Sequence, residues 1–197
     1  MKKAIFFILI AGLAIPGLVK AQSAYTSFQY QIGFGMGDLG DYISKTSFRG
    51  AVFDYQKNMT SNISVGLELA WNTFYEDMGY DTYTVDTYSL SGKQFRYSNM
   101  FPMLATVEYY FISEGPLKPY FNLGLGTMYT IRNTDMGIWS FEDKVWQFAL
   151  KPELGVIYEV GYNTSLKLEA KYYTGFGSSL ETQSFFAIST GMVWNIF

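Results

Sequence analysis

The carboxy-terminal segment 184–197 alternates regularly between large and small side chains, and this alternation is the feature that most constrains the fold. Every second residue from Phe186 onward is large or carries a methyl group: Phe186, Ile188, Thr190, Met192, Trp194 and Ile196. The residues between them are mostly small or polar: Ala187, Ser189, Gly191, Val193 and Asn195. A period of two over this length predicts a strand with one face in an apolar medium. A chain that ends on such a strand, with an aromatic last residue, is typical of a membrane β-barrel.

Residues 1–21 have the pattern of a secretory signal peptide. A short basic start precedes an apolar stretch over 4–16, and Val19 and Ala21 are the small residues that a signal peptidase reads. The apolar stretch is too short to span a bilayer comfortably, which disfavours an amino-terminal anchor helix. The chain has no cysteine, so lipoprotein attachment is excluded. We expect a cleaved signal peptide followed by one barrel domain over 22–197.

The composition narrows the class of protein further. Processing removes three of the 14 basic residues (Lys2, Lys3 and Lys20) and leaves 11 against 17 acidic ones, a formal net charge of −6. This acidic balance argues against a nucleic-acid partner, because neutralising phosphates requires clustered Lys and Arg. The absence of cysteine fits export through an oxidising periplasm without a disulfide framework. No later segment offers about 18 uninterrupted apolar residues, so a helical membrane protein is disfavoured.

Eight segments have the alternation and length of membrane-spanning strands, between turn signals. They are 25–37, 46–56, 63–75, 93–111, 120–132, 144–158, 165–174 and 184–197. An even number of antiparallel strands with both ends on one side is what barrel closure requires. The connections after the second, fourth and sixth strands are short, whereas the polar, tyrosine-rich stretch 76–92 is predicted to be a long external loop. The fold class predicted is all-β: a closed, antiparallel, eight-stranded transmembrane barrel.

Three positions complicate this pattern. In the second strand Arg49 and Asp54 fall on opposite faces, so we expect a bulge near Gly50. Pro102 and Pro152 fall inside predicted strands, where each removes a hydrogen bond from the ladder. We expect a local bulge at each proline, or a misplaced strand boundary.

Aromatic residues are frequent at the ends of the predicted strands, where interfacial girdles form in membrane proteins. We assign eight of them to these girdles: Trp71, Tyr75, Tyr109, Tyr110, Phe111, Tyr120, Tyr172 and Tyr173.

Nine charged residues are predicted to face the barrel interior. They are Glu68, Arg96, Glu108, Arg132, Lys151, Glu153, Lys167, Glu169 and Lys171. Buried ionisable groups must pair or stay hydrated, and an eight-stranded barrel is only wide enough to be filled by side chains. These residues therefore form either an interlocked salt-bridge core that plugs the barrel or the lining of a narrow gated pore.

A soluble barrel of the lipocalin type is the alternative class, since it also has eight strands. It would place the apolar side chains inside the barrel and the charged ones outside. The apolar face is too bulky for such an interior, and the signal peptide and terminal Phe197 also argue against it.

Taken together, these features resemble the small eight-stranded outer-membrane barrels, the group that contains the OmpX-like and OmpA-like barrel domains. The resemblance covers 22–197 and rests on strand count, alternation, signal peptide and the terminal Trp194-Asn195-Ile196-Phe197. Phe197 departs from many members because it is out of phase with the apolar series. The resemblance implies a location in the cell outer membrane and insertion by the barrel-assembly machinery. It also implies outer-membrane lipid and lipopolysaccharide as partners, with another outer-membrane protein as a further candidate.

The residue inventory predicts no enzyme. The chain contains no histidine, which removes His-based triads, dyads and metal sites. Barrel enzymes of the lipid A deacylase, omptin protease and lipid A acyltransferase types depend on a histidine, and zinc is further disfavoured by the missing cysteine. We predict no catalytic, cofactor-binding or metal-ligating residue, and no cofactor.

The segments predicted to lie outside the membrane are acidic, with Asp38, Asp41, Glu76 and Asp77 among their carboxylates. The function predicted is a structural, adhesion or accessory-subunit role without catalysis. A narrow channel for small solutes and, less favoured, a soluble ligand-binding barrel are the alternatives.

Overall fold

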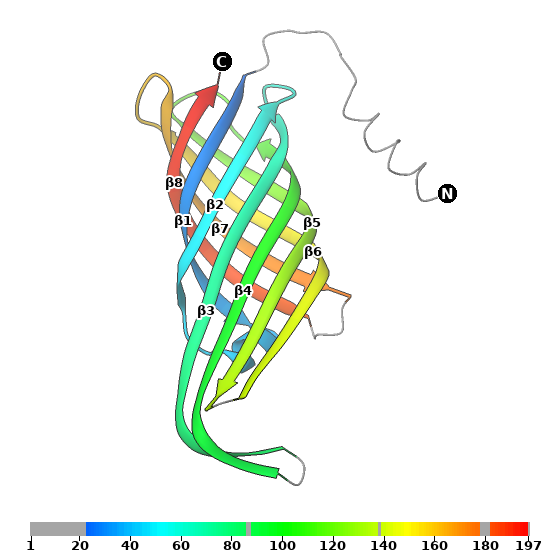
Figure 1. The fold of residues 1–197 in the computed structure, drawn as a ribbon. Helices are drawn as coiled ribbons and strands as arrows, with labels where there is room; N and C mark the ends of the chain where they lie inside the picture. Colours follow the sequence, from blue (N-terminus) through cyan, green and yellow to red (C-terminus); the bar gives the residue numbers. More distant parts are fainter. Residues whose placement is uncertain (1–22, 86–87, 138, 178–181, 197) are drawn as a thin grey trace, which may run out of the picture.

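The computed structural model describes residues 23–85, 88–137, 139–177 and 182–196, with side chains outside 83–90. In these residues eight strands, each antiparallel to the next in sequence, close into a barrel (Figure 1). They are β1 (Ala24–Met36), β2 (Ser47–Asn58), β3 (Ile63–Val85), β4 (Tyr88–Tyr110), β5 (Leu117–Met136), β6 (Trp139–Glu159), β7 (Thr164–Phe176) and β8 (Gln183–Ile196). A six-residue helix, α2 (Gly37–Tyr42), follows β1. The predicted fold class is confirmed.

The first and last strands close the barrel along their whole length. Their ladder runs from Ala24 opposite Ile196 to Met36 opposite Ser184 without a change of register. The start of β1 and the end of β8 therefore lie at one end of the barrel, which we call the terminal end (Figure 1). The turns 59–62, 111–116 and 160–163 are at this end, and α2 and the β3–β4 hairpin are at the opposite end, which we call the far end.

The bulge expected near Gly50 is present. Gln31 pairs with Gly50 but Gly33 pairs with Ser47, so β2 carries one more residue than β1 across this step. Phe48 and Arg49 are both exposed as a result, while Ser47 and Gly50 face inward. A bulge re-aims side chains in this way. The Tyr30 hydroxyl donates a hydrogen bond of 2.6 Å to the Phe48 carbonyl and so satisfies an acceptor at the bulge.

The bulges expected at the two prolines are absent, and both prolines lie inside strands. β3 and β4 pair in the same register on both sides of Pro102, with Leu69 opposite Met103 and Asn72 opposite Met100. β6 and β7 likewise keep one register across Pro152. The expectation of a bulge or a misplaced boundary was wrong, because the rest of each ladder holds the strand in place where the proline lacks its donor.

The segment 76–92 is mostly strand rather than the predicted loop. β3 and β4 pair from Ile63 opposite Tyr109 to Val85 opposite Tyr88, with a shift of register between Asp77 and Tyr80. Gly79 at this shift has a φ of +78°, a conformation that glycine adopts without strain. The two strands continue as a ribbon well beyond the barrel body (Figure 1).

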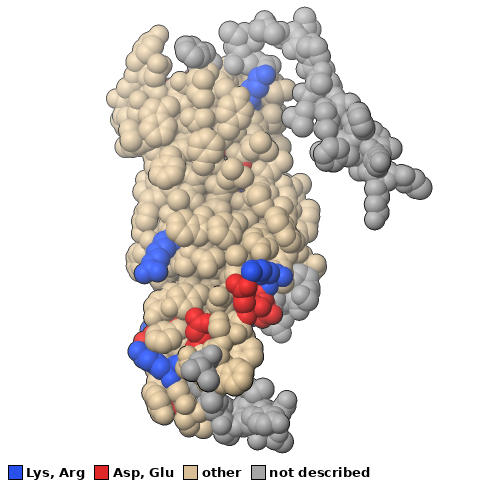
Figure 2. Space-filling model, in the orientation of Figure 1, with Lys and Arg blue, Asp and Glu red and all other residues tan. Residues whose placement is uncertain are grey.

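The side chains divide by alternation into a polar interior and an apolar exterior. Outward-facing residues such as Phe28, Leu67 and Leu154 are each nearly 60% exposed, at 57%, 59% and 59%. The charged residues on the face shown in Figure 2 gather toward the far end, below a broad belt that carries almost none. Large apolar exteriors of this kind belong in lipid. The lipocalin-like alternative is therefore overturned, because its interior and exterior are reversed here.

Aromatic residues mark the far-end edge of the apolar belt. Phe101, Tyr129 and Trp146 are paired across β4, β5 and β6, and the rings of Tyr129 and Trp146 lie 4.7 Å apart. Three tyrosines that we assigned to the girdles face the interior instead: Tyr110, Tyr120 and Tyr173. Tyr110 lies two residues after the inward-facing Glu108 in β4, so the alternation of the strand already places its side chain inside the barrel.

No helix among the described residues is long and apolar enough to cross a membrane. The predicted signal peptide 1–21 and the terminal Phe197 lie outside the described residues.

Candidate functional site

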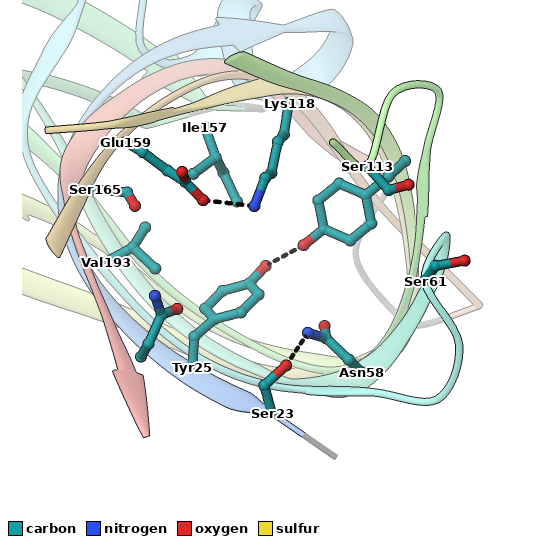
Figure 3. Close-up of a pocket in the computed structure, with 12 residues that line it drawn as sticks. Ser23, Tyr25, Asn58, Ser61, Ser113, Lys118, Ile157, Glu159, Ser165 and Val193 are labelled. Atoms are coloured by element: carbon teal, nitrogen blue, oxygen red, sulfur yellow. Dashed lines mark hydrogen bonds and ion pairs between the residues drawn. The ribbon is translucent and has the colours of Figure 1, made fainter. Parts of the chain in front are cut away.

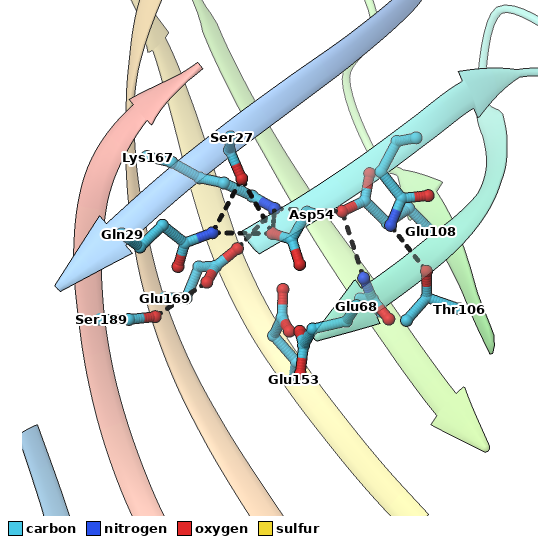
Figure 4. A network of polar contacts seen from close by, with 12 residues as sticks. Ser27, Gln29, Asp54, Glu68, Thr106, Glu108, Glu153, Lys167, Glu169 and Ser189 are labelled. Atoms are coloured by element: carbon cyan, nitrogen blue, oxygen red, sulfur yellow. Dashed lines mark hydrogen bonds and ion pairs between the residues drawn. The ribbon is translucent and has the colours of Figure 1, made fainter. Parts of the chain in front are cut away.

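The middle of the barrel interior is filled by charged side chains, which we call the central charged layer. Its members are at most 2% exposed: Asp54, Glu68, Glu108, Lys151, Glu153, Lys167, Glu169 and Lys171. They come from five of the eight strands, β2, β3, β4, β6 and β7, and the members labelled in Figure 4 point toward one another across the lumen. Strand β7 supplies Lys167, Glu169 and Lys171 because its inward positions alternate with lipid-facing ones.

The β7 residues form the centre of this layer. The two oxygens of Glu169 each lie 2.6 Å from an ammonium group, Oε1 from Lys167 and Oε2 from Lys171. Ser189 donates a further hydrogen bond of 2.8 Å to Oε2. Lys171 also lies 3.2 Å from Glu68, which accepts a hydrogen bond from Lys151. Each charge is therefore shared between at least two partners.

Lys167 connects β7 to the opposite wall. Its Nζ lies 3.1 Å from Asp54 Oδ2 and 3.4 Å from Glu108 Oε1. Ser27 and Gln29 on β1 donate hydrogen bonds of 2.9 and 2.7 Å to the same Asp54 oxygen. These contacts cross the lumen in several directions (Figure 4), so they close the bore and tie strands distant in sequence together.

The central charged layer has an unequal number of acidic and basic groups. Five carboxyl groups face three ammonium groups among its members. Removing one ammonium therefore increases a formal excess of negative charge, whereas removing one carboxylate reduces it.

A second layer closes the lumen at the terminal end. It consists of Tyr25, Tyr110, Tyr120, Ile157 and Val193. The hydroxyls of Tyr25 and Tyr110 both donate hydrogen bonds to Glu108 Oε2. The Tyr120 hydroxyl lies 3.0 Å from Glu153 and 2.5 Å from Glu169. This tyrosine layer thus sits directly on the carboxylates of the central charged layer and separates them from the terminal end.

Outside the tyrosine layer is a shallow polar cup of about 230 Å³ (Figure 3). Its rim includes the ion pair between Lys118 and Glu159, at 2.5 Å, and the hydrogen bond from Asn58 to Ser23. Tyr25 and Tyr110 lie at its base, where their hydroxyls are 3.2 Å apart. The cup is therefore blind: it opens to the terminal end and stops at the tyrosines.

A third layer, apolar, fills the far end of the lumen. Its largest members are Phe74, Met100, Met128, Tyr173 and Phe185, and the Tyr173 and Phe185 rings stack at 4.6 Å. Leu39 of α2 and Ile43 pack into it, and both are fully buried. The backbones of α2 and β1 approach so closely that a Cβ at Gly40 would lie 2.9 Å from the Gly35 carbonyl oxygen.

The residues 37–46, which we call the cap segment, are fastened across the far-end mouth. Arg96 donates a hydrogen bond of 2.9 Å to the Tyr42 carbonyl, and the Arg132 guanidinium lies 4.1 Å from the centre of the Tyr42 ring. Ser44 donates hydrogen bonds of 2.6 and 2.8 Å to the Glu76 carboxylate through its backbone nitrogen and hydroxyl. The cap segment thus bridges the mouth to the far-end parts of β3, β4 and β5.

Seven of the nine predicted interior charges belong to the central charged layer. Arg96 and Arg132 do not, because they lie near the far-end mouth and hold Tyr42 instead. Asp54 joins the layer although the prediction left it out. The bulge near Gly50 interrupts the alternation of β2, so the residues before it do not predict which later side chains face inward. Alternation counted back from the buried Gln56 would have placed Asp54 inside.

This interior is closed toward both ends of the barrel. Its charged groups are sealed between the tyrosine and apolar layers, and the part of the chain that the structure describes holds no cluster of three or more metal-ligating acidic side chains. A substrate entering from either end would meet the blind cup or the cap segment. Of the two arrangements predicted from the sequence, the structure shows the interlocked salt-bridge core.

No family model matches the chain, and no curated protein matches it by sequence. Solved structures do match it. The outer membrane protein OprG from Pseudomonas aeruginosa is 12% identical with a TM-score of 0.58, over 90% of this chain and 97% of OprG. Ail, the attachment invasion locus protein of Yersinia pestis, solved with a heparin analogue, is 12% identical with a TM-score of 0.52, over 89% and 97%.

The outer membrane protease OmpT from Escherichia coli also matches, at 9% identity and a TM-score of 0.53, over 92% of this chain and 99% of OmpT. These proteins differ in what they do, and identities this low establish the fold alone. The matches agree with the outer-membrane location predicted from the sequence, as does the apolar exterior. The chain resembles the small outer-membrane β-barrels and has their fold.

Proposed function

We propose that this protein is a non-enzymatic barrel of the outer membrane with an occluded lumen. It uses the β3–β4 ribbon beyond the barrel body, which we call the projecting sheet, for attachment to another molecule. The terminal end, with its short turns, faces the periplasm, and the far end faces the exterior. Outer-membrane lipid and lipopolysaccharide surround the apolar belt. Insertion by the barrel-assembly machinery follows from the same fold, and another outer-membrane protein is a candidate partner.

The observation that carries this proposal is the free edge of β3. The β2–β3 ladder ends at Gly50 opposite Asn72, yet β3 continues to Val85. Ser47 donates a hydrogen bond to the Thr73 carbonyl, and beyond it no described strand pairs with this side of β3. An open strand edge outside the membrane is a template for pairing with an extended chain.

The outermost part of the sheet also lacks support of its own. Beyond the shift of register at Asp77 and Tyr80, β3 pairs only with β4, and the β4–β5 ladder begins at Gln94. Isolated two-stranded ribbons are marginally stable in water. A ribbon of this kind gains stability when a partner adds a strand to it. The fold is compatible with attachment, since Ail shares it.

The channel alternative has less support because the lumen is filled at three levels. The tyrosine layer, the central charged layer and the apolar layer each close the bore, and the cap segment covers the mouth. Catalysis has less support for the same reason, together with the absence of histidine from the chain.

Shortening the ribbon tests the proposal. Residues 80–92 are replaced by a two-residue Asn-Gly turn, which suits a hairpin. We expect the variant to fold, shown by heat-modifiable migration in gels, but cells displaying it to adhere less to animal cells or immobilised proteins than cells with the intact barrel. Equal adherence of both would contradict the attachment role.

Planar-bilayer recording and activity assays test the other classes. A steady conductance of the intact barrel, altered by Lys167 or Lys171 substitution, would favour the channel. Hydrolysis of lipid A, phospholipid or peptide that disappears on one Ser or Asp substitution would establish an enzyme.

A further inference from the structure

Two cations at the outer rim of the barrel form no ion pair with a described residue, whereas two other lysines at this end do. The basic residues at the far end in the described ranges are Lys45, Arg49, Lys93, Arg96, Arg132 and Lys144. Lys93 pairs with Asp77 at 2.7 Å and Lys144 with Glu142 at 2.5 Å. Arg96 and Arg132 hold the cap segment. Lys45 and Arg49 are exposed, and neither forms an ion pair in the described part of the chain.

The height of Arg49 relative to the membrane follows from the strand register. Ala51 pairs with Trp71, and Arg49 is the next outward-facing position toward the exterior. Trp71, like Phe101, Tyr129 and Trp146, belongs to the aromatic edge of the apolar belt, where such rings lie at the level of lipid headgroups. Two residues along a tilted strand add roughly 5 Å of height. Arg49 therefore reaches the charged part of the outer-leaflet headgroups.

The bulge in β2 gives this cation an apolar neighbour. Phe48 and Arg49 both face outward, and Phe48 is 64% exposed. The Tyr30 hydroxyl holds the Phe48 carbonyl at 2.6 Å, and the Ser47 hydroxyl accepts a hydrogen bond of 3.3 Å from the Arg49 backbone nitrogen. Phe48 precedes Arg49 at the far end of β2, so its ring lies at the level of the headgroups and not among the acyl chains. A guanidinium suits phosphate in particular, because its fork of donors binds two phosphate oxygens.

We propose that Arg49, together with Lys45, forms a binding site for a phosphate monoester headgroup of an outer-leaflet lipid. Arg49 binds the phosphate at headgroup level, and Lys45, four residues earlier and also exposed, adds a second positive charge. Most other charged groups at this end are carboxylates, which disfavour an anion, so the site is confined to the start of β2. Such a site fixes the barrel to particular lipids and acts independently of the projecting sheet.

The arginine side chains allow a direct test. The chain contains three arginines, so the Nε–H signals of Arg49, Arg96 and Arg132 can be followed together by nuclear magnetic resonance of the processed barrel in zwitterionic micelles. Titration with dioctanoyl phosphatidic acid, a phosphate monoester lipid, should shift the Arg49 signal saturably and leave the other two in place. Dioctanoyl phosphatidylcholine at the same concentrations should shift none of them.

Two outcomes of this titration would overturn the proposal. Equal shifts at all three arginines would show a general charge effect. A shift of Arg49 by inorganic phosphate at the same concentration would assign the site to a free anion rather than to a lipid headgroup.

Matched variants complete the test. Their affinity for phosphatidic acid is measured from the chemical shift of the Ala51 backbone amide during the titration. Arg49→Gln and Lys45→Gln should each weaken phosphatidic acid binding about fivefold, as expected for one cation at an anionic lipid surface. Lys144→Gln is the control, because Lys144 lies at a similar height but is paired with Glu142. Unchanged affinity in both test variants, or an equal loss in the control, would refute the site. Lys45→Gln retains the Arg49 signal and so keeps the test decisive if Arg49→Gln fails to fold.

Discussion

Glu169 and Lys171 lie two residues apart on β7 and form an ion pair of 2.6 Å that is completely withdrawn from solvent. A charged pair in such a place requires further partners, because desolvation opposes it. Here the partners come from both sides: Lys167 shares the Glu169 carboxylate, and Glu68 shares the Lys171 ammonium. The network as a whole, rather than any single pair, therefore holds the centre of the barrel.

Removing a lysine from this network should lower the free energy of unfolding more than removing a carboxylate. Lys171→Met raises the formal excess of negative charge in the central charged layer, whereas Glu169→Gln lowers it. We expect Lys171→Met to reduce the free energy of unfolding by roughly 3–5 kcal/mol, the usual cost of an uncompensated buried charge, and Glu169→Gln by clearly less. Urea unfolding in lipid vesicles measures both. Equal losses would show that the charge imbalance does not govern stability.

The apolar layer should be important for stability but not for sealing the lumen. Phe74→Ala removes a fully buried ring that packs edge-on against Phe185 at 5.5 Å. We expect a loss of about 3–5 kcal/mol in unfolding free energy. Bilayer recordings of the same variant should show no steady conductance, because Tyr25 and Tyr110 still close the terminal end. A stable open channel in Phe74→Ala would identify the apolar layer as the main seal.

Barrel closure should depend on Gly191. A Cβ at this position would lie 2.1 Å from the Phe28 carbonyl oxygen on β1, so Gly191→Ala forces the β1–β8 contact apart. We expect destabilisation of roughly 3 kcal/mol, the upper end of overpacking costs, and a smaller folded fraction in heat-modifiability gels. Gly92→Ala is the matched control, since its nearest neighbour, Met136 Cγ, is 3.8 Å from the new Cβ. Similar behaviour of the two variants would contradict this account.

The pair between Asp77 and Lys93 should titrate as a surface feature of the projecting sheet. The hydrogen bond from Lys93, and after it the one from the Gly79 backbone, lowers the pKa of Asp77 below its ordinary value. The pair therefore supports the sheet at neutral pH and is lost as the pH falls through the lowered pKa. Lys93→Gln should raise the Asp77 pKa toward its usual value, measured from the carboxyl carbon shift, and added salt should do the same in part. A pKa that does not respond to either change would exclude the pair as the cause.

The strands and their orientation were predictable because a membrane barrel imposes a strict period of two. Glu108, Glu153 and Lys167 were placed inward correctly on that basis alone. Alternation fails where the backbone departs from it, as at Gly50, and there the prediction omitted Asp54. The tyrosines were misplaced for a different reason. Tyr110 and Tyr120 were assigned to the girdles because they are aromatic residues at strand ends, although the alternation of their strands places them inside the barrel.

The far end was harder to predict because its elements are specified by tertiary contacts. The sequence of 76–92 is polar and tyrosine-rich and lacks the amphipathic pattern of a membrane strand, yet its described residues pair as strand. The cap segment contains one short helix whose position depends on Arg96, Arg132 and Glu76, which are distant in sequence. Residues so far apart in sequence cannot be paired by a local pattern.

The β1–β8 ladder determines when folding can finish. Ala24 pairs with Ile196 and Met36 with Ser184, so the first strand to be synthesised must wait for the last before its second edge is covered. Contacts across nearly the whole chain close slowly, because the entropy of a long loop is lost before the contact forms. Until that step β1 exposes an open, partly apolar edge in the periplasm, where it can aggregate. The last strand is therefore a checkpoint: a chain truncated before it cannot reach the barrel, however sound its other seven strands are.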